Sequence, residues 1–107
     1  MKIALDWDGT FTRDPNLWYH FMGMCKAMGH DIRIVTLRTP AMAIDWGNEL
    51  LPAYRIPVIY TSNVQKREYC DSIDWHPDIW IDDSPEFIVR RDFHTFLDVF
   101  GAVKEEI

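Results

Sequence analysis

Two short apolar segments of this chain end in the same way, in a pair of aspartates. Ile3-Ala4-Leu5 runs into Asp6-Trp7-Asp8-Gly9-Thr10, and Ile79-Trp80-Ile81 runs into Asp82-Asp83. Short apolar runs are typical of strands that are buried on both faces of a parallel sheet. The carboxyl ends of such strands form the edge where ligands bind in open α/β sheets. The pattern therefore predicts a sheet that gathers four carboxylates at one edge.

Four carboxylates at one edge repel one another strongly unless a cation lies among them. Hard divalent cations such as Mg²⁺ are held by one or two protein carboxylates together with water and substrate phosphate. The sequence therefore predicts Mg²⁺ as the cofactor, bound by Asp6, Asp8, Asp82 and Asp83.

Composition excludes several other classes of protein. The 107 residues suffice for one domain with a modest core, which we expect to span 1–107. A formal net charge of −6 disfavours broad binding to a nucleic-acid backbone. No apolar run approaches the roughly 20 residues that span a bilayer, and the first motif begins at residue 6, so we expect no membrane partner, no signal peptide and a cytoplasmic location.

Predicted strands and helices alternate along the chain. The apolar pattern predicts strands over 2–6, 32–36, 56–60 and 78–81. Asp14-Pro15, Thr39-Pro40 and Ser84-Pro85 each combine a capping residue with a proline, which is typical of a helix start. They predict helices from 15 to 28, from about 40 to 51, and from 85 onward, and a further short helix is expected over 64–72; the tail after 93 favours another. This order predicts an α/β fold, a three-layer Rossmann-like parallel sheet with helices on both faces.

Four segments of the chain carry polar residues in an order that resembles the haloacid dehalogenase superfamily. The segments are Asp6-x-Asp8-Gly9-Thr10 after the first strand, Thr36 at the end of the second, Lys66 after the third, and Asp82-Asp83 after the fourth. The resemblance covers nearly the whole chain and implies the fold of that superfamily and a hydrolase that removes phosphate from a phosphomonoester.

The resemblance also implies a role for each catalytic residue. Asp6 would be the nucleophile that forms an aspartyl-phosphate intermediate. Asp8 would be the general acid and base, and its backbone carbonyl would bind Mg²⁺. Thr36 and Lys66 would bind the transferring phosphoryl oxygens. Asp82 is the favoured side-chain ligand of the metal, with Asp83 either sharing that role or orienting a metal-bound water.

Several of these residues allow a second interpretation. Lys66 lies in a segment that is equally typical of a solvated helix face, and the adjacent Arg67 is an alternative candidate for the basic residue of the site. Trp7 could pack against a base or an apolar leaving group of the substrate, or belong to the core. Gly9 and Thr10, in the loop after the first strand, are predicted to bind the substrate, and Arg38 could bind a second phosphate or the remote end of the substrate.

Spacing leaves no room for the cap domain that many members of the superfamily insert. Only 25 residues separate Thr10 from Thr36, and 29 separate Thr36 from Lys66. We therefore expect a capless, Mg²⁺-dependent phosphatase that acts on a nucleotide or on a phosphate of nucleic acid or protein. Its open site would be covered by a large substrate or by the neighbouring subunit of a homo-oligomer. The alternative is a binding protein that sequesters a nucleotide without turnover.

Overall fold

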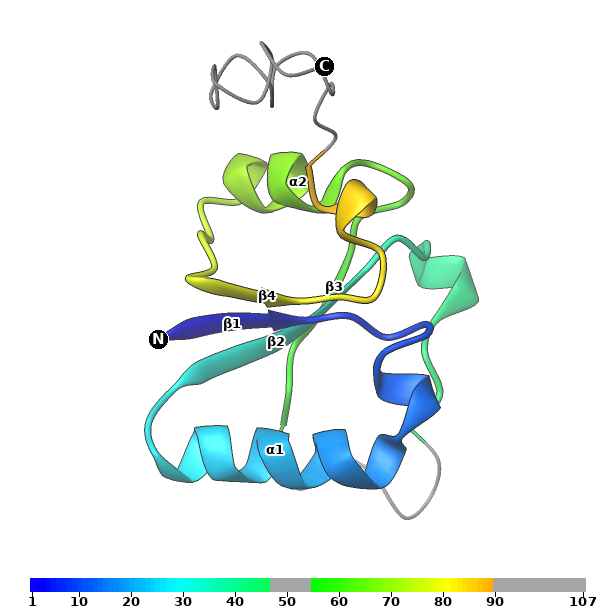
Figure 1. Cartoon of the computed structure of the whole chain (residues 1–107). Helices are drawn as coiled ribbons and strands as arrows, with labels where there is room; N and C mark the ends of the chain where they lie inside the picture. The colour runs from blue at the N-terminus through cyan, green and yellow to red at the C-terminus, as the bar shows by residue number, and fades with distance from the viewer. Residues whose placement is uncertain (47–54, 90–107) are drawn as a thin grey trace, which may run out of the picture.

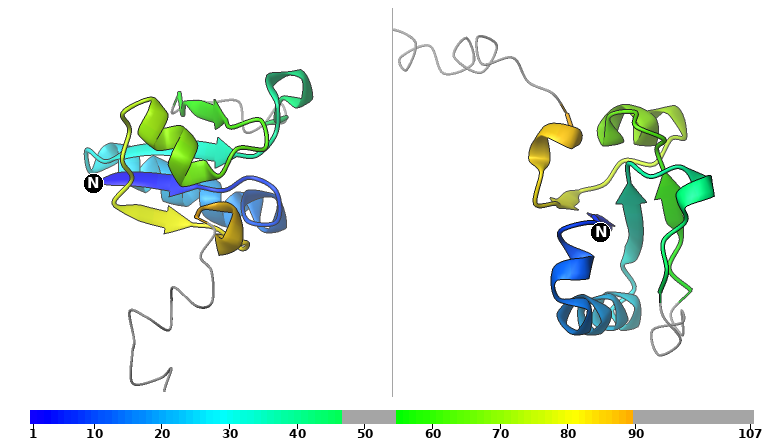
Figure 2. Two further views of the ribbon diagram at one scale, coloured as in Figure 1. Left: turned by 90° about the horizontal axis from the view of Figure 1, so that it is seen from above. Right: turned by 90° about the vertical axis from the view of Figure 1, so that its right-hand side faces the viewer.

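The computed structural model describes residues 1–46 and 55–89. These residues form an α/β fold around a sheet of four parallel strands in the order β3-β2-β1-β4, as Figure 2 shows from above. The strands are β1 (Lys2–Leu5), β2 (Asp31–Thr36), β3 (Val58–Tyr60) and β4 (Ile79–Ile81). The predicted strands are confirmed, although β3 and β4 begin later than expected.

One helix lies on each face of the sheet (Figure 1). The helices are α1 (Pro15–Ala27) and α2 (Lys66–Ser72), and three single turns of 3₁₀ helix accompany them: η1 (Phe11–Arg13), η2 (Pro40–Met42) and η3 (Pro85–Phe87). Helix α1 begins as its sequence predicts, because Asp14 caps it by accepting a 3.2 Å hydrogen bond from the backbone N–H of Leu17. None of the described helices is long and apolar enough to cross a membrane.

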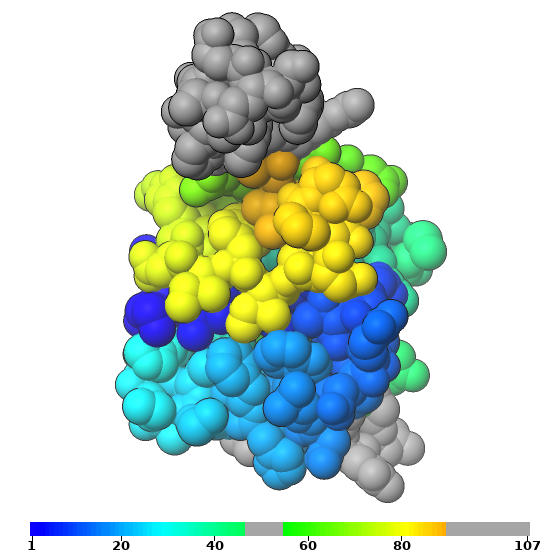
Figure 3. Space-filling model, viewed as in Figure 1, coloured from blue at the N-terminus to red at the C-terminus, as the bar shows by residue number. Residues whose placement is uncertain are grey.

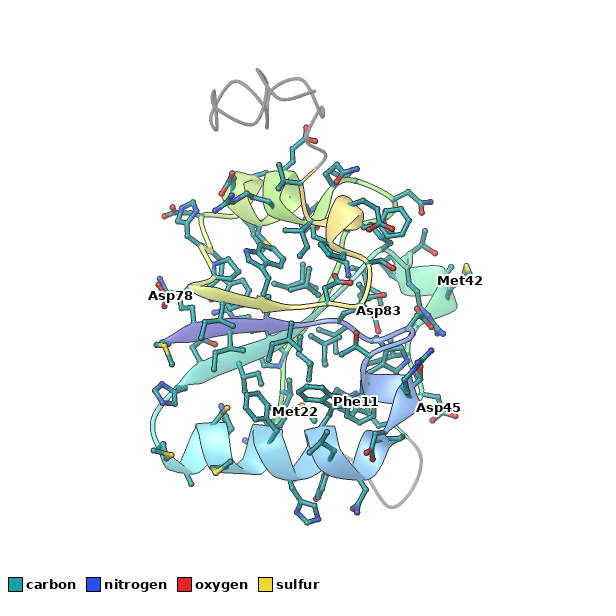
Figure 4. The ribbon with its side chains drawn as sticks, viewed as in Figure 1. Phe11, Met22, Met42, Asp45, Asp78 and Asp83 are labelled. Carbon is teal, nitrogen blue, oxygen red and sulfur yellow. The ribbon has the colours of Figure 1, made fainter. Side chains whose placement is uncertain are left out.

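Alternate residues of each strand point to opposite faces of the sheet and make two separate cores. The core on the α1 side contains Ile3, Leu5, Trp7, Phe11, Met22, Cys25, Ile32, Ile34, Ile44 and Ile56. The core on the α2 side contains Ala4, Val35, Ile59, Cys70 and Trp75. Figure 4 shows Phe11 and Met22 between the sheet and α1. Both cysteines are free and buried, one in each core.

The helix predicted over 40–51 is wrong for its described part. Only the turn η2 forms, and residues 43–46 are not helical; residues 47–51 lie outside the described part of the chain. Tertiary contacts take the backbone groups that a helix would use, since the N–H of Ile44 donates to the hydroxyl of Tyr60 at 3.2 Å. Ile44 itself is buried in the core on the α1 side. Of the helix expected from 85 onward, the described residues 85–89 form only the turn η3, and the predicted helix in the tail lies outside the described residues.

The order of the strands creates a crevice between β1 and β4. The chain passes from β1 to β2 to β3 in one direction and then returns to place β4 on the other side of β1. Figure 3 shows β4, in yellow, along the front of the molecule above α1. In open α/β sheets, ligands bind outside the carboxyl ends of the strands at such a reversal. We call the end of the sheet that holds the carboxyl ends of the four strands the carboxyl edge, and the end that holds their amino ends the amino edge.

Candidate active site

Strands β1 and β4 carry their aspartates to the carboxyl edge together. The N–H of Asp6 donates to the carbonyl of Ile81 at 2.9 Å, so the pairing of the two strands continues one residue beyond β1. A cavity of about 260 Å³ opens at this edge. Its lining includes every residue predicted to be catalytic or metal-binding: Asp6, Asp8, Thr36, Lys66, Asp82 and Asp83. Asp83, one of these lining residues, is labelled in Figure 4.

Lys66 joins the two strands through their carboxylates. It is the first residue of α2, and only 2% of its surface is exposed. Its ammonium donates to Asp6 Oδ1 at 2.7 Å and also to Asp82 Oδ2. Arg67, its rival in the sequence, is exposed and does not line the cavity. A buried cation between two carboxylates can also donate to the oxygens of a phosphoryl group.

Thr10 and Gly9 bring Asp83 close to Asp6. The Thr10 hydroxyl lies 3.1 Å from both Asp6 Oδ2 and Asp83 Oδ1, and it accepts from the N–H of Asp83 at 3.1 Å. Since a hydroxyl has one proton, it donates to only one of the two carboxylates at a time. Gly9 has φ of +85°, and a Cβ there would collide with the Asp83 carboxylate. In the structure the two residues position Asp83, and their predicted contact with substrate stays a prediction.

The pKa values at the site are displaced in opposite directions. Burial raises the pKa of Asp6 to about 6, although Lys66 acts to lower it. A hydrogen bond with Asp6 lowers the pKa of Asp83. The two directions agree, because a proton held by Asp6 is stabilised by the negative charge of Asp83. Burial therefore favours the protonated form of Asp6 more strongly than Lys66 favours the ionised form.

The aspartate cluster has the donors that Mg²⁺ prefers. Oxygen atoms of Asp6, Asp82 and Asp83 all lie within 4.8 Å of one another. Carboxylate oxygens are hard ligands, and a divalent cation would supply the missing positive charge, so these three side chains fit Mg²⁺. The side chain of Asp8 lies outside this group; its predicted contact with the metal is through its backbone carbonyl and stays a prediction.

Asp8 lines the cavity and pairs with Arg38, which is not among the lining residues. The guanidinium donates to both carboxylate oxygens, from Nη2 at 2.7 Å and from Nε at 2.9 Å. The backbone N–H of Arg38 donates to the hydroxyl of Thr36 at 3.3 Å. Since that hydroxyl accepts from the backbone, its own proton can be donated to a ligand in the cavity.

Trp7 is a core residue in the structure rather than a substrate contact. Only 4% of its surface is exposed. Its ring stacks on Phe11 with centroids 4.2 Å apart and meets Trp46 edge to face. Three such rings bury a large apolar area beneath the Asp6–Thr10 loop and hold it in place. Of the two interpretations that the sequence left open for Trp7, its burial favours the core residue.

The cavity has three lining residues that the sequence did not single out, Leu37, Ser84 and Phe87. Ser84 had been assigned only as a helix start. Its N–H donates to Asp82 Oδ1 at 2.9 Å and so orients that carboxylate. The signal was present in the sequence, because a serine that directly follows two site aspartates lies in the same loop.

A second, more apolar cavity of about 490 Å³ lies behind Asp83. Leu17, Trp18 and Ile81 contribute its apolar wall.

Comparison with protein-family models, with curated proteins and with solved structures finds no match to this chain. Function therefore has to be inferred from the side chains of the carboxyl edge.

Proposed function

We propose that this protein is a Mg²⁺-dependent phosphatase that acts through an aspartyl-phosphate intermediate and has the capless fold of the haloacid dehalogenase superfamily. One observation carries the proposal: the buried ammonium of Lys66 bridges Asp6 and Asp82 within a cavity that also holds Asp8, Thr36 and Asp83. A site that only binds an anion would be weakened by four carboxylates. Their presence is explained if one is a nucleophile, one a general acid and the others ligands of a metal.

The proposed reaction has two steps. A carboxylate oxygen of Asp6 attacks the phosphorus, the bond from phosphorus to the leaving oxygen breaks, and Asp8 gives that oxygen a proton. Water then attacks the aspartyl phosphate, Asp8 takes its proton, and the bond to Asp6 breaks to release phosphate. Lys66 and the Thr36 hydroxyl hold the phosphoryl oxygens throughout. Mg²⁺ held by Asp6, Asp82 and Asp83 would supply positive charge against the anionic phosphoryl group.

Hydrolysis of p-nitrophenyl phosphate tests this proposal. We expect release of phosphate that requires Mg²⁺ and falls by at least about 10³-fold in Asp6→Asn, because the amide is no nucleophile. Asp74→Asn is the matched control, since its side chain is 95% exposed and asparagine tolerates its φ of 55°. Activity that survives EDTA, or that persists in Asp6→Asn, would contradict the mechanism.

A thermal melt tests the metal site without any substrate. Millimolar Mg²⁺ should raise the melting temperature by mass action, and Asp82→Asn should reduce the rise. A melt that does not respond to Mg²⁺ would show that the cluster is no metal site. Screening nucleotides, sugar phosphates, phosphopeptides and phosphorylated oligonucleotides would then identify the class of substrate.

The pairing of Asp8 with Arg38 favours a second candidate function. The carboxyl group that should transfer protons is held by two hydrogen bonds to a guanidinium. In addition, residues 11–35 form only η1, α1 and the start of β2, so no cap covers the cavity from that segment. A protein that binds a nucleotide without turnover, with a neighbouring subunit closing the site, would have the same features.

A further inference from the structure

The Arg38 guanidinium presents an anion-binding fork to Asp8, which lines the cavity. Two of its N–H groups point in parallel at the two oxygens of Asp8, at 2.7 and 2.9 Å. This geometry is the one in which arginine binds the carboxylate or phosphate of a ligand. The Asp8 carboxylate thus marks where an anionic group of the same shape can bind.

Other contacts hold Arg38 in place independently of Asp8. Its Nη1 donates to the carbonyl of Met42 at 3.3 Å, and its backbone N–H donates to Thr36 at 3.3 Å. The carbonyl of Met42 belongs to the last residue of η2, in the segment where a longer helix had been expected. The fork is therefore preorganised, which lowers the entropy that a ligand loses on binding to it.

The bond between Arg38 and Asp8 costs little to exchange. The Asp8 side chain is 54% exposed and that of Arg38 is 30% exposed. Ion pairs in contact with water contribute only about 0–1 kcal/mol, because each partner is nearly as well solvated alone. By contrast, the pair between Lys66 and Asp6 is almost completely buried. A ligand anion can therefore displace Asp8 from Arg38 far more easily than it can separate Lys66 from Asp6.

We propose that Arg38 is a binding site for a second anionic group of the ligand, a carboxylate or a further phosphate beside the phosphoryl group, and that Asp8 holds the place of this group. The proposal rests on the proposed phosphate site and names its class of substrate, a phosphomonoester with a second anionic group. Displacement also frees the Asp8 carboxyl group for the proton transfers assigned to it. The ion pair that favoured a binding protein then becomes a feature of an enzyme that selects its substrate.

Binding of phosphonates, which cannot be hydrolysed, tests the site directly by calorimetry in Mg²⁺. The probes are benzylphosphonate, its 3- and 4-carboxy derivatives, the matching carboxamides, and the bisphosphonate on the same ring. At least one acid should bind wild-type protein about tenfold or more tightly than its amide, as expected for a new charge-assisted bidentate contact. The bisphosphonate shows whether the fork prefers carboxylate or phosphate.

Three variants separate the fork from charge alone. In Arg38→Gln the preference for acid over amide should fall to within about threefold. Arg38→Lys keeps the charge without the two parallel donors and should give an intermediate preference. Arg67→Gln removes an exposed charge outside the cavity and should keep the full preference. The rise in melting temperature with Mg²⁺ confirms that each variant is folded.

Each possible result bears on one proposal or both. Acid and amide that bind equally well to wild type, or a preference that persists in Arg38→Gln, would overturn the second anion site and leave the phosphatase proposal standing. If no phosphonate binds even in Mg²⁺, the phosphate site itself fails and the inference fails with it.

Discussion

The two edges of the sheet each carry a cluster of charged side chains, and the clusters differ in how well their charges are matched. At the amino edge, Asp31 accepts from Arg33 Nε and Nη2 at 3.1 Å and from Trp75 Nε1 at 3.0 Å. The same guanidinium lies 4.5 Å from the centre of the Trp75 ring. At the carboxyl edge, Lys66 is shared between Asp6 and Asp82.

The difference between the edges is visible in the pKa shifts of their aspartates. Burial acts to raise the pKa of Asp31, but hydrogen bonds from Arg33 and Trp75 outweigh it and lower that pKa overall. Burial raises the pKa of Asp6 to about 6, because Lys66 does not offset it. A lowered pKa at the amino edge is typical of an ion pair that stabilises the fold. A raised carboxyl pKa in a cavity is typical of a functional site, where the ionised carboxylate is unfavourable until a ligand binds.

The largest effect expected from this comparison is on turnover. Asp8→Asn should lower the rate of phosphate release by about 10² to 10⁴, since proton transfer by a general acid and base contributes that much. Binding of benzylphosphonate should change little, because the amide keeps the shape of the acid. Parallel measurement of turnover and phosphonate affinity checks both statements.

Recovery of bound ligand distinguishes the proposed phosphatase from a sequestering protein. Wild-type protein is incubated with candidate nucleotides and denatured, and the released species are separated by chromatography. An enzyme yields phosphate and product, whereas a binding protein returns intact nucleotide at stoichiometric occupancy and is indifferent to Asp8→Asn. Intact ligand after hours of incubation would decide against the phosphatase.

Removing one cation from each edge should affect stability unequally. Lys66→Met leaves two nearly buried carboxylates without their shared partner and should cost about 3 kcal/mol of unfolding free energy. Arg33→Met at the amino edge breaks a partly exposed pair and should cost less than about 1 kcal/mol. Urea unfolding of both variants at pH 7.5 in EDTA measures the difference. Equal losses would contradict the expectation that the buried bridge of Lys66 is the more costly of the two pairs to break.

A glycine with positive φ lies near each edge and allows a second matched test. Gly29, in the turn before β2, has φ of +81° and open space around its missing Cβ, so Gly29→Ala should cost about 1 kcal/mol for backbone conformation alone. Gly9→Ala pays the same conformational cost and must also displace Asp83, so we expect about 2 kcal/mol or more. Gly9→Ala should also reduce the rise in melting temperature with Mg²⁺, which Gly29→Ala should leave unchanged.

The sequence predicted the carboxyl edge better than the segments that surround it. Asp6 and Asp82 could be placed together because strand ends in a parallel sheet converge whatever lies between them. Lys66 could be placed from its position after β3, although only the fold shows that it, rather than Arg67, is buried. The local sequence pattern was enough to place a site residue wherever the order of the strands alone determines where that residue lies.

The remaining features depend on contacts between segments far apart in the chain. The helix signal at Thr39-Pro40 was overridden because Ile44 bonds to Tyr60 and enters the core. Trp7 packs on Phe11, which belongs to the single turn η1, and no periodic pattern of apolar residues predicts that turn. The pairing of Arg38 with Asp8 joins residues 30 positions apart, so neither neighbourhood indicates it.

The last expected effect is on the pH dependence of stability, and it has opposite sign at the two edges. The folded pKa of Asp6, about 6, exceeds its ordinary value of 3.8, so the native state binds more protons between these values. The free energy of unfolding should therefore fall as pH rises through this window, by about 1–2 kcal/mol in total once solvent screening is allowed for. Asp31 has a lowered pKa, and its contribution is lost only as pH falls below about 4.

Unfolding by urea in EDTA at pH 4.5, 5.5, 6.5 and 7.5 separates the two edges. Relative to wild type, Asp6→Asn should gain stability from the lowest to the highest pH, because the amide is never charged. Asp31→Asn should differ from wild type by a constant amount over the same range. Saturating Mg²⁺ should remove the slope that Asp6 causes, since a bound cation stabilises the ionised carboxylate. A difference between Asp6→Asn and wild type that stays flat from pH 4.5 to 7.5 would mean that the carboxyl edge is as well balanced as the amino edge, and that the distinction between them fails.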